Sequence, residues 1–440
     1  MIRASLTALT VLFVASPATA DDRAAALHEY MARYHQLGQF SGTALVVEAD
    51  DVLLRQGYGL ADQQDELANQ PALSFAIGSI SKSFTSKLVL QLIDEGLLEP
   101  DKTIADYLPY YRTDTAAEIT LRHLLTHTDG LSNYTNNPEF WQPYDGIAPM
   151  STREFIQAYC SSNLQFTPGG EYRYGNAGYS ILGAIIEEVS GKSYAEVLQE
   201  RVAKPLGMRA TGDMGAASPV VKMARGYQVG PDGYRLAEPI YKPLFAAGSL
   251  YASADDLLSY VNSLDTEVLL PRIAEDVDDG VFAYGWTVSE FRADGAADRS
   301  RMLSTNGEVN GYNALLVHII ESQQTIILLS NIGETDLSGM AVTVLGLLHG
   351  GQPDLPMPRT RDAFYLALQE QGVEAAIKVY RDHRNEDPND YIYFRWPLRI
   401  LAQQLLDDKR TEDAVQFLEL NLETHPDDAR TEQMLRSISE

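Results

Sequence analysis

A serine stands three residues before a lysine, at the start of a helical pattern, in the segment Phe75-Ala76-Ile77-Gly78-Ser79-Ile80-Ser81-Lys82-Ser83-Phe84-Thr85. Residues three apart share one face of a helix, so the Lys82 amine is expected beside the Ser79 hydroxyl. A serine hydroxyl is a weak nucleophile near neutral pH until a neighbouring base removes its proton. The spacing therefore predicts a nucleophile placed together with its own activator.

The composition is that of a globular protein with an acidic surface. The 440 residues suggest more than one domain, and a hydrophobic content of 45% is ordinary for a protein with a packed core. The formal net charge of −27 disfavours binding to nucleic acid and to anionic membrane surfaces. The single cysteine, Cys160, excludes an internal disulfide, and its helical surroundings predict a small core residue.

Residues 1–20 have the pattern of an export signal. Arg3 supplies a positive start, Leu6 to Val14 an apolar run, and Ala18-Thr19-Ala20 a small-residue cleavage site. The apolar run is too short to span a bilayer, and no other stretch has a transmembrane pattern. We therefore expect cleavage before Asp21 and a periplasmic or secreted protein without stable membrane insertion.

The pattern of strands and helices predicts an α+β fold. Two hairpins, over residues 40–62 and 315–332, lie at opposite ends of a unit whose middle, from about residue 97 to 220, is mostly helix and loop. Helices are expected from about Ser79 to Gly96, over 177–189 and over 336–348. This order predicts an antiparallel sheet flanked by helices, with a large helical insertion.

A second region follows the first. Residues 21–350 form the predicted main domain, residues 351–361 contain three prolines and have the pattern of a linker, and residues 362–440 have an all-helical pattern. A faint repeat at an offset of 38 residues matches Ala376-Ile377 and Pro388 with Ala414-Val415 and Pro426. It resembles a degenerate tetratricopeptide pair, and an unrelated helical cap is the alternative. These helices are expected to dock on the main domain and are a candidate surface for a protein partner.

Two further segments can bring polar groups to the serine. After the turn Pro168-Gly169-Gly170, a tyrosine, Tyr174, precedes an asparagine, Asn176, by two residues. A phenol relays protons when a neighbouring cation lowers its pKa, and Lys82 is the candidate cation. The segment Ser304-Thr305-Asn306-Gly307-Glu308-Val309 leads into a strand, and Gly307 permits a close backbone approach. A strand edge there can offer a backbone N–H to an oxyanion.

The three segments together resemble the serine hydrolase family of class C β-lactamases, penicillin-binding DD-peptidases, related esterases and D-amino-acid peptidases. Its motifs Ser-x-x-Lys, Tyr-x-Asn and Lys/His-x-Gly occur in this chain order, at 79–82, 174–176 and 305–307. Family-like stretches also lie at 121–131, 204–208 and 246–250. The resemblance covers about residues 25–350 and implies a β-lactamase/transpeptidase-like fold.

The resemblance also implies roles for individual residues. Ser79 attacks a carbonyl carbon and forms an acyl-enzyme, while Lys82 and Tyr174 form the proton-transfer pair. Asn176 hydrogen-bonds Lys82 or the substrate amide. The oxyanion hole is built from the backbone N–H groups of Ser79 and Glu308. The family needs no metal and no cofactor.

One departure from the family pattern bears on the substrate. The third motif usually opens with a cation that holds a substrate carboxylate, but Thr305 stands at that position here. Arg299 or Arg301 is a candidate replacement. The departure favours an esterase, an amidase or a D-amino-acid peptidase, acting on a small molecule or a peptide, over a β-lactamase or a DD-carboxypeptidase. It also keeps open a degraded domain that binds a partner through its C-terminal helices, although intact Ser79 and Lys82 favour the enzyme.

His123 and His127 invite interpretation as metal ligands or as partners of the serine. No acidic residue has the spacing of a zinc protease, and the segment resembles a structural stretch of the family. We therefore expect both histidines to be structural.

Overall fold

The computed structural model describes residues 19–141, 150–215, 222–230, 233–237, 244–292, 299–352, 355–357, 360–385 and 391–439. The predicted export signal lies outside this set except for its last two residues, which form the N-cap (Thr19) and the first residue of helix α1, Ala20–Gln36. Within the described ranges, no helix is both long and apolar enough to cross a membrane.

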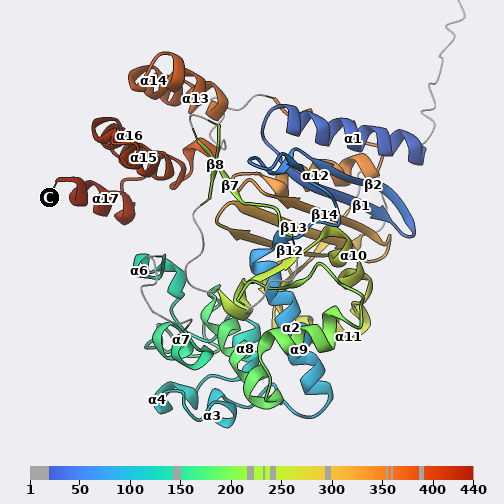
Figure 1. Ribbon diagram of the computed structural model, residues 1–440. Helices are drawn as coiled ribbons and strands as arrows, with labels where there is room; N and C mark the ends of the chain where they lie inside the picture. Colours follow the sequence, from blue (N-terminus) through green and yellow to red (C-terminus); the bar gives the residue numbers. More distant parts are fainter. Residues whose placement is uncertain are drawn as a thin grey trace, which may run out of the picture.

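A seven-stranded antiparallel sheet forms the centre of the main domain (Figure 1). Its strand order is β10-β11-β12-β13-β14-β1-β2, so the two ends of the domain meet where β1 pairs with β14. The strands are β1 Gly42–Glu48, β2 Asp51–Tyr58, β10 Phe282–Ala283, β11 Trp286–Phe291, β12 Ser300–Val309, β13 Tyr312–Ile319 and β14 Gln324–Ser330. The two predicted hairpins are therefore adjacent in one sheet.

Helices cover both faces of this sheet, and strand β1 shows why. Its alternate residues Ala44 and Val46 pack toward α1 and α12 (Leu337–Leu348), whereas Leu45 and Val47 pack toward α2 (Ser81–Asp94). Successive side chains of a strand point to opposite faces, so a strand between two layers must be apolar on both. Full burial of each such side chain contributes about 1.5–3 kcal/mol. The predicted fold class is confirmed.

The helical insertion lies below the sheet in Figure 1 and surrounds α8, Ala177–Ser190. The first ten residues of α8 are all buried, and a Cβ atom on Gly183 would lie 2.4 Å from that of Ala246. The remaining helices of the main domain are α3 Ile104–Tyr107, α4 Thr113–Ala116, α5 Leu121–Leu125, α6 Pro138–Trp141, α7 Thr152–Tyr159, α9 Tyr194–Leu198, α10 Ala254–Asn262 and α11 Thr266–Asp276. Short helical turns are η1 Gly78–Ile80, η2 Tyr134–Asn136, η3 Gln199–Ala203 and η4 Phe245–Ala247.

Small two- and three-stranded pairings complete the domain. They comprise β3 Leu60–Asp62, β4 Leu67–Ala68, β5 Phe75–Ala76, β6 Gly212–Asp213, β7 Tyr227–Gly230, β8 Gly233–Leu236 and β9 Leu250–Ala252. Strand β5 leads directly into η1 and α2, and it pairs with β9. This pairing fixes the entry to the segment that carries Ser79. Cys160 caps the end of α7 and is buried as a free thiol.

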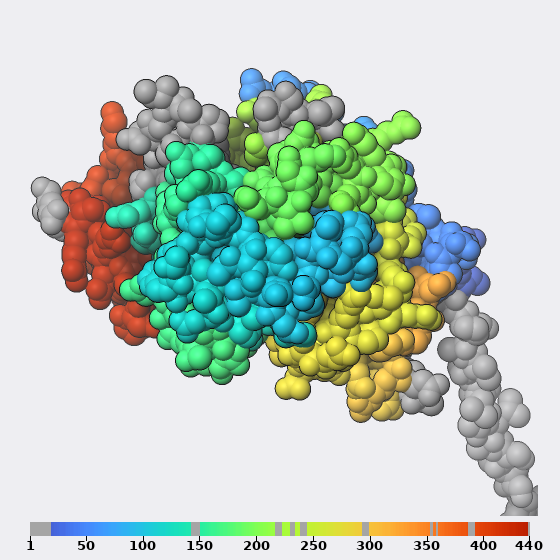
Figure 2. All heavy atoms as spheres, turned by 90° about the horizontal axis from the view of Figure 1, so that it is seen from below, coloured from blue at the N-terminus to red at the C-terminus, as the bar shows by residue number. Residues whose placement is uncertain are grey.

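The C-terminal region is a separate helical unit with its own core. It consists of α13 Thr360–Glu370, α14 Val373–His383, η5 Tyr391–Tyr393, α15 Pro397–Asp407, α16 Thr411–Thr424 and α17 Ala429–Ser439. Ala376 and Ala414, which define the sequence repeat, are each the fourth residue of their helix and fully buried. The tetratricopeptide assignment stays a prediction. Figure 2 shows the unit, in red, against one side of the main domain.

Side-chain contacts join this C-terminal unit to the sheet. Arg361 pairs with Glu334 at 3.6 Å, and both side chains are almost completely buried. Gln39 donates a hydrogen bond to the carbonyl of Met357 (2.9 Å). The helix that follows the predicted linker begins at Thr360, so Arg361 belongs to the docked unit.

Truncation after Gly351 is expected to leave a soluble, folded main domain of lower stability. The C-terminal core is separate, but the shortened protein loses the ion pair of Arg361 with Glu334, a charged contact worth about 1.5–3 kcal/mol. Thermal unfolding followed by circular dichroism should show a melting temperature lower by about 1–1.5 °C per kcal/mol lost, as the unfolding entropy of a protein of this size implies. Full-length Arg361→Ala is the matched control and should show most of this loss. An insoluble truncated chain would show that the helices belong to the core.

Candidate active site

The structure brings the serine, lysine and tyrosine of the first two motifs together. Ser79 lies in η1, immediately before α2, and Lys82 lies in the first turn of that helix. The Lys82 Nζ atom is 3.0 Å from Ser79 Oγ, and the Tyr174 hydroxyl is 2.7 Å from the same atom. One oxygen thus has an amine and a phenol within hydrogen-bond distance, as an activated nucleophile requires.

The surroundings of Lys82 favour the neutral amine. Its side chain is fully buried, and this burial lowers the pKa of Lys82 well below its usual value. Two acceptors besides Ser79 surround Nζ: Asn176 Oδ1 at 2.7 Å and the carbonyl of Ala247 at 2.8 Å. A neutral amine donates its two protons to these acceptors, and its lone pair then points at Ser79. That orientation is the one a general base needs.

Tyr174 is a neutral phenol at the same oxygen. About 37% of the residue is exposed, but the hydroxyl end is enclosed, and burial raises the pKa of Tyr174 to about 12. The expectation that Lys82 lowers this pKa is therefore wrong, although the amine lies 5.0 Å from the centre of the tyrosine ring. The physical reason is that burial disfavours the charged phenolate more than the hydrogen bond with Ser79 favours it.

Asn176 is held by residues that the sequence did not single out. Its Nδ2 group donates to Asn133 Oδ1 (3.3 Å) and to Thr135 Oγ1 (3.2 Å), which fixes the amide with its oxygen toward Lys82. Ala247 contributes through its backbone carbonyl alone. It lies in the family-like stretch 246–250, but a carbonyl leaves no side-chain signal in a sequence.

The third motif lies against the nucleophile. A Cβ atom on Gly307 would lie 1.9 Å from the carbonyl oxygen of Ile77 and 2.6 Å from Ser79 N, so only glycine fits. A Cβ atom on Gly78 would likewise lie 2.7 Å from Glu308 N. Strand β12 pairs with β11 only as far as Ser304, which leaves this part of its edge facing η1. Residues 307–308 of β12 therefore pack directly against the backbone of Gly78 and Ser79.

Neither Arg299 nor Arg301 supplies the missing cation near Thr305. Thr305 is 2% exposed, and its hydroxyl finds no partner among the described residues. Arg299 pairs with Glu290, and Arg301 pairs with Glu321 at 2.7 Å. Four residues of strand separate Arg301 from Thr305, about 13 Å at the usual rise. Both arginines are thus paired with acidic side chains near the start of β12, the end away from Thr305.

Both histidines have structural contacts. His123 forms a capping box with Thr120 at the start of α5. His127 is fully buried, accepts a hydrogen bond from the backbone of Gly175 (3.3 Å), and its ring lies tilted with its centre 4.7 Å from that of Tyr174. His127 therefore packs against the loop that carries Tyr174 and Gly175. In the part of the chain that the structure describes, no group of His, Cys, Asp or Glu side chains is arranged to hold a metal ion.

The two perturbed groups predict the pH dependence of acylation. The base must be neutral, so the rate should rise as pH increases through the lowered pKa of Lys82. The plateau should persist above pH 9, because the pKa of Tyr174 is about 12. The measurement is the acylation rate of a neutral substrate from pH 5 to 10, with circular dichroism to verify folding at each pH. If the acylation rate rose only around pH 10, the ordinary pKa of lysine, Lys82 would not be the neutral base.

Comparisons with known proteins agree with this geometry. The β-lactamase family profile matches residues 24–347. A penicillin-binding protein of Bacillus subtilis is 25% identical over 318 residues, which cover 67% of this chain and 68% of the relative. A teichoic acid D-alanine hydrolase of Staphylococcus aureus is 26% identical over 243 residues, 55% of this chain and 58% of the relative.

A solved structure shows the same fold. The D-amino acid amidase of Ochrobactrum anthropi, determined with D-phenylalanine, superimposes with a TM-score of 0.63 at 21% identity, over 75% of this chain and 99% of the amidase. The family match spans well over half of the sequence and includes every residue that surrounds Ser79. The chain belongs to the β-lactamase family of serine hydrolases.

Proposed function

We propose that this protein is an exported serine hydrolase that cleaves an ester or amide bond through an acyl-enzyme on Ser79. The observation that carries the proposal is the buried Lys82 amine, whose two other acceptors leave its lone pair for Ser79 Oγ. The proposed domain division is residues 21–350 for catalysis, a linker that begins at residue 351, and a helical accessory unit that begins with α13 at Thr360 instead of at residue 362.

The proposed reaction conserves protons at each step. Lys82 takes the proton of Ser79 as Oγ bonds to the substrate carbonyl carbon, and the oxyanion that forms accepts hydrogen bonds from the backbone N–H groups of Ser79 and Glu308. Tyr174 gives its proton to the leaving oxygen or nitrogen as that bond breaks, and it recovers a proton from Lys82. Water then attacks the acyl-enzyme with the same pair acting in reverse.

The charges around the site favour substrates without a carboxylate. Thr305 carries no charge, and Arg299 and Arg301 are paired elsewhere. An anionic β-lactam therefore finds no fixed cation at this strand, and the net charge of −27 adds a weak long-range repulsion. The named substrates of the hydrolase and amidase relatives support a D-aminoacyl ester or amide.

A substrate panel tests this proposal. p-Nitrophenyl esters, D-aminoacyl anilides and a chromogenic cephalosporin are compared under one set of conditions. We expect a neutral short-chain ester or a D-aminoacyl anilide to be turned over faster than the cephalosporin. Faster cephalosporin hydrolysis would identify a β-lactamase instead. A folded protein that neither turns over any substrate nor reacts with a fluorophosphonate would favour a partner-binding role.

A further inference from the structure

The C-terminal unit contacts the main domain next to the residues that hold Lys82. We propose that Arg430, on the final helix α17, is a positioning residue for Lys82 and acts through the turn η2. The inference rests on the proposed function, because it concerns proton transfer at Ser79. It assigns to the C-terminal unit a part in catalysis.

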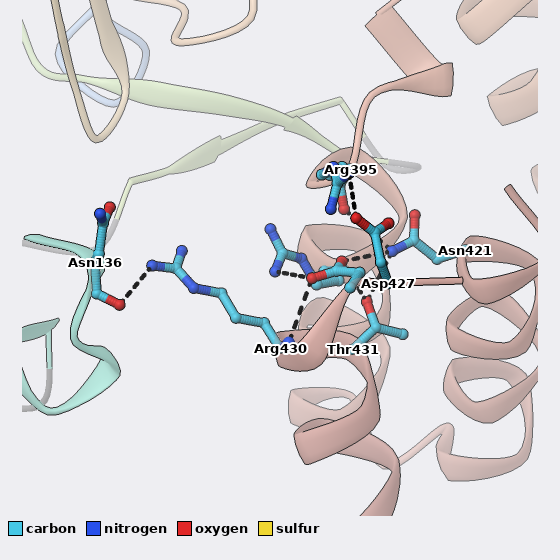
Figure 3. A network of polar contacts seen from close by, with 8 residues as sticks. Asn136, Arg395, Asn421, Asp427, Arg430 and Thr431 are labelled. Carbon is cyan, nitrogen blue, oxygen red and sulfur yellow. Dashed lines mark hydrogen bonds and ion pairs between the residues drawn. The ribbon is translucent and has the colours of Figure 1, made fainter. Parts of the chain in front are cut away.

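A buried polar network fixes the start of α17 (Figure 3). Asn421 on α16 donates to Asp428 Oδ2 (3.0 Å) and to Thr431 Oγ1 (2.7 Å), and Thr431 donates to the same carboxylate oxygen (2.7 Å). Asn421, Asp428 and Thr431 are all more than nine-tenths buried. Arg399 adds an ion pair to Asp428 at 3.2 Å. Charged and polar groups in a low-dielectric interior hold their geometry strongly, so the first turn of α17 has one defined position.

Arg430 extends from this fixed turn to the main domain. Its backbone N–H donates to Asp428 Oδ1 (3.3 Å), and its guanidinium donates to the carbonyl of Asn136 (3.4 Å). Figure 3 shows the side chain of Arg430 reaching across to Asn136. Asn136 is the last residue of η2, so α17 restrains the position of that turn.

The other residues of this turn contact Asn176 and the segment that leads to Ala247. Asn133 and Thr135 accept hydrogen bonds from the amide of Asn176, which in turn accepts a hydrogen bond from Lys82. Tyr134 donates to the carbonyl of Leu244 (3.4 Å), three residues before the carbonyl of Ala247 that Lys82 also uses. A shift of η2 therefore moves Asn176, one of the two acceptors that orient the Lys82 lone pair.

The C-terminal unit also contacts the main domain at two other places, next to the end of β14 and at the separate two-stranded sheet β7-β8. Arg361 pairs with Glu334 beyond the end of β14, and Asp408 pairs with Arg235 on β8 at 3.0 Å. The seven-stranded sheet carries Glu308, whereas the helical insertion carries Tyr174 and Asn176. The C-terminal unit thus bridges the two halves of the site, and Arg430 is its contact with the helical half.

Loss of Arg430 should raise the pKa of Lys82. The titratable groups that face Lys82 are Tyr174, Tyr179 and His127, and burial keeps all three neutral. Desolvation is the cause of the lowered pKa of Lys82, so water admitted around a displaced η2 favours the ammonium form. The acid limb of the acylation rate then moves to higher pH. A variant that only unfolds part of the protein lowers the rate equally at every pH.

The test compares three full-length variants with the parent protein. Arg430→Ala removes the contact, Arg430→Lys keeps a charged donor, and Arg436→Ala removes an exposed arginine that pairs with Glu432 on the same helix. Acylation by a p-nitrophenyl ester is measured from pH 5 to 10, together with the melting temperature. We expect acylation of Arg430→Ala to be slower by about 3- to 10-fold at pH 6.5, and its rate to rise at a higher pH than that of the parent. Arg430→Lys should recover most of this loss, and Arg436→Ala should match the parent.

Two results would overturn the inference: a rate and pH profile of Arg430→Ala that match the parent, or a loss that is uniform with pH and explained by the unfolded fraction. A parent protein that forms no covalent adduct at Ser79 would overturn the proposed function as well. A parent that forms the adduct, with Arg430→Ala unchanged, rejects only the role of Arg430.

Discussion

Ser79→Ala is expected to abolish formation of the acyl-enzyme and to lower kcat by about four or more orders of magnitude. Ser79 Oγ is the atom that Lys82 and Tyr174 both reach, at 3.0 and 2.7 Å, and alanine has no atom there to attack a carbonyl. Mass spectrometry after reaction with a slow acyl donor should place the adduct on the peptide that contains Ser79.

A second serine on the same helix provides the matched control for that experiment. Ser83 is buried, and its hydroxyl donates to the carbonyl of Ile80 (2.8 Å), away from the reacting groups. Ser83→Ala should keep its acylation rate within a few-fold of the parent. An adduct on another peptide, or full activity of Ser79→Ala, would reject Ser79 as the nucleophile.

The parts of the site that were predictable are those that depend on local spacing. Ser79 and Lys82 lie within one turn of backbone, so the helix alone determines their approach. Gly307 was predictable as a close backbone contact because it has no side chain. The hairpins at the two ends of the main domain were predictable from alternating and continuous apolar runs, and both lie in the sheet.

The remaining features depend on how distant segments pack. The carbonyl of Ala247 reaches Lys82, and the side chains of Asn133 and Thr135 reach Asn176, only after segments distant in the chain pack together. The direction of the Tyr174 pKa shift depends on burial, which no motif records. The pairing of Arg301 with Glu321 depends on the register of β12 against β13. Each of these contacts is tertiary, so neighbouring sequence cannot specify it.

The charge at the candidate active site differs from the strongly negative charge of the whole chain. The chain has a net charge of −27, yet the one amine at the nucleophile is buried and has a lowered pKa. Burial therefore favours the neutral forms of Lys82 and Tyr174 in the resting site. In the proposed reaction, negative charge develops in the transition state, and the backbone N–H groups of Ser79 and Glu308 are its proposed hydrogen-bond donors. Stabilisation that acts mainly on the transition state raises kcat instead of only tightening substrate binding.

Lys82→Ala and Tyr174→Phe are each expected to slow acylation by two or more orders of magnitude, the range for loss of general acid–base help. The double variant should lose much less than the product of the two single losses, because both groups move protons at the same oxygen. Lys87→Ala, later on the same helix, and Tyr194→Phe, a buried tyrosine bonded to Thr85 (2.8 Å), are the matched controls. Single-turnover rates measure the coupling directly, since they isolate acylation from the later release of the acyl group. Multiplicative losses would show that the lysine and the tyrosine act independently, and a proton relay between them would then be wrong.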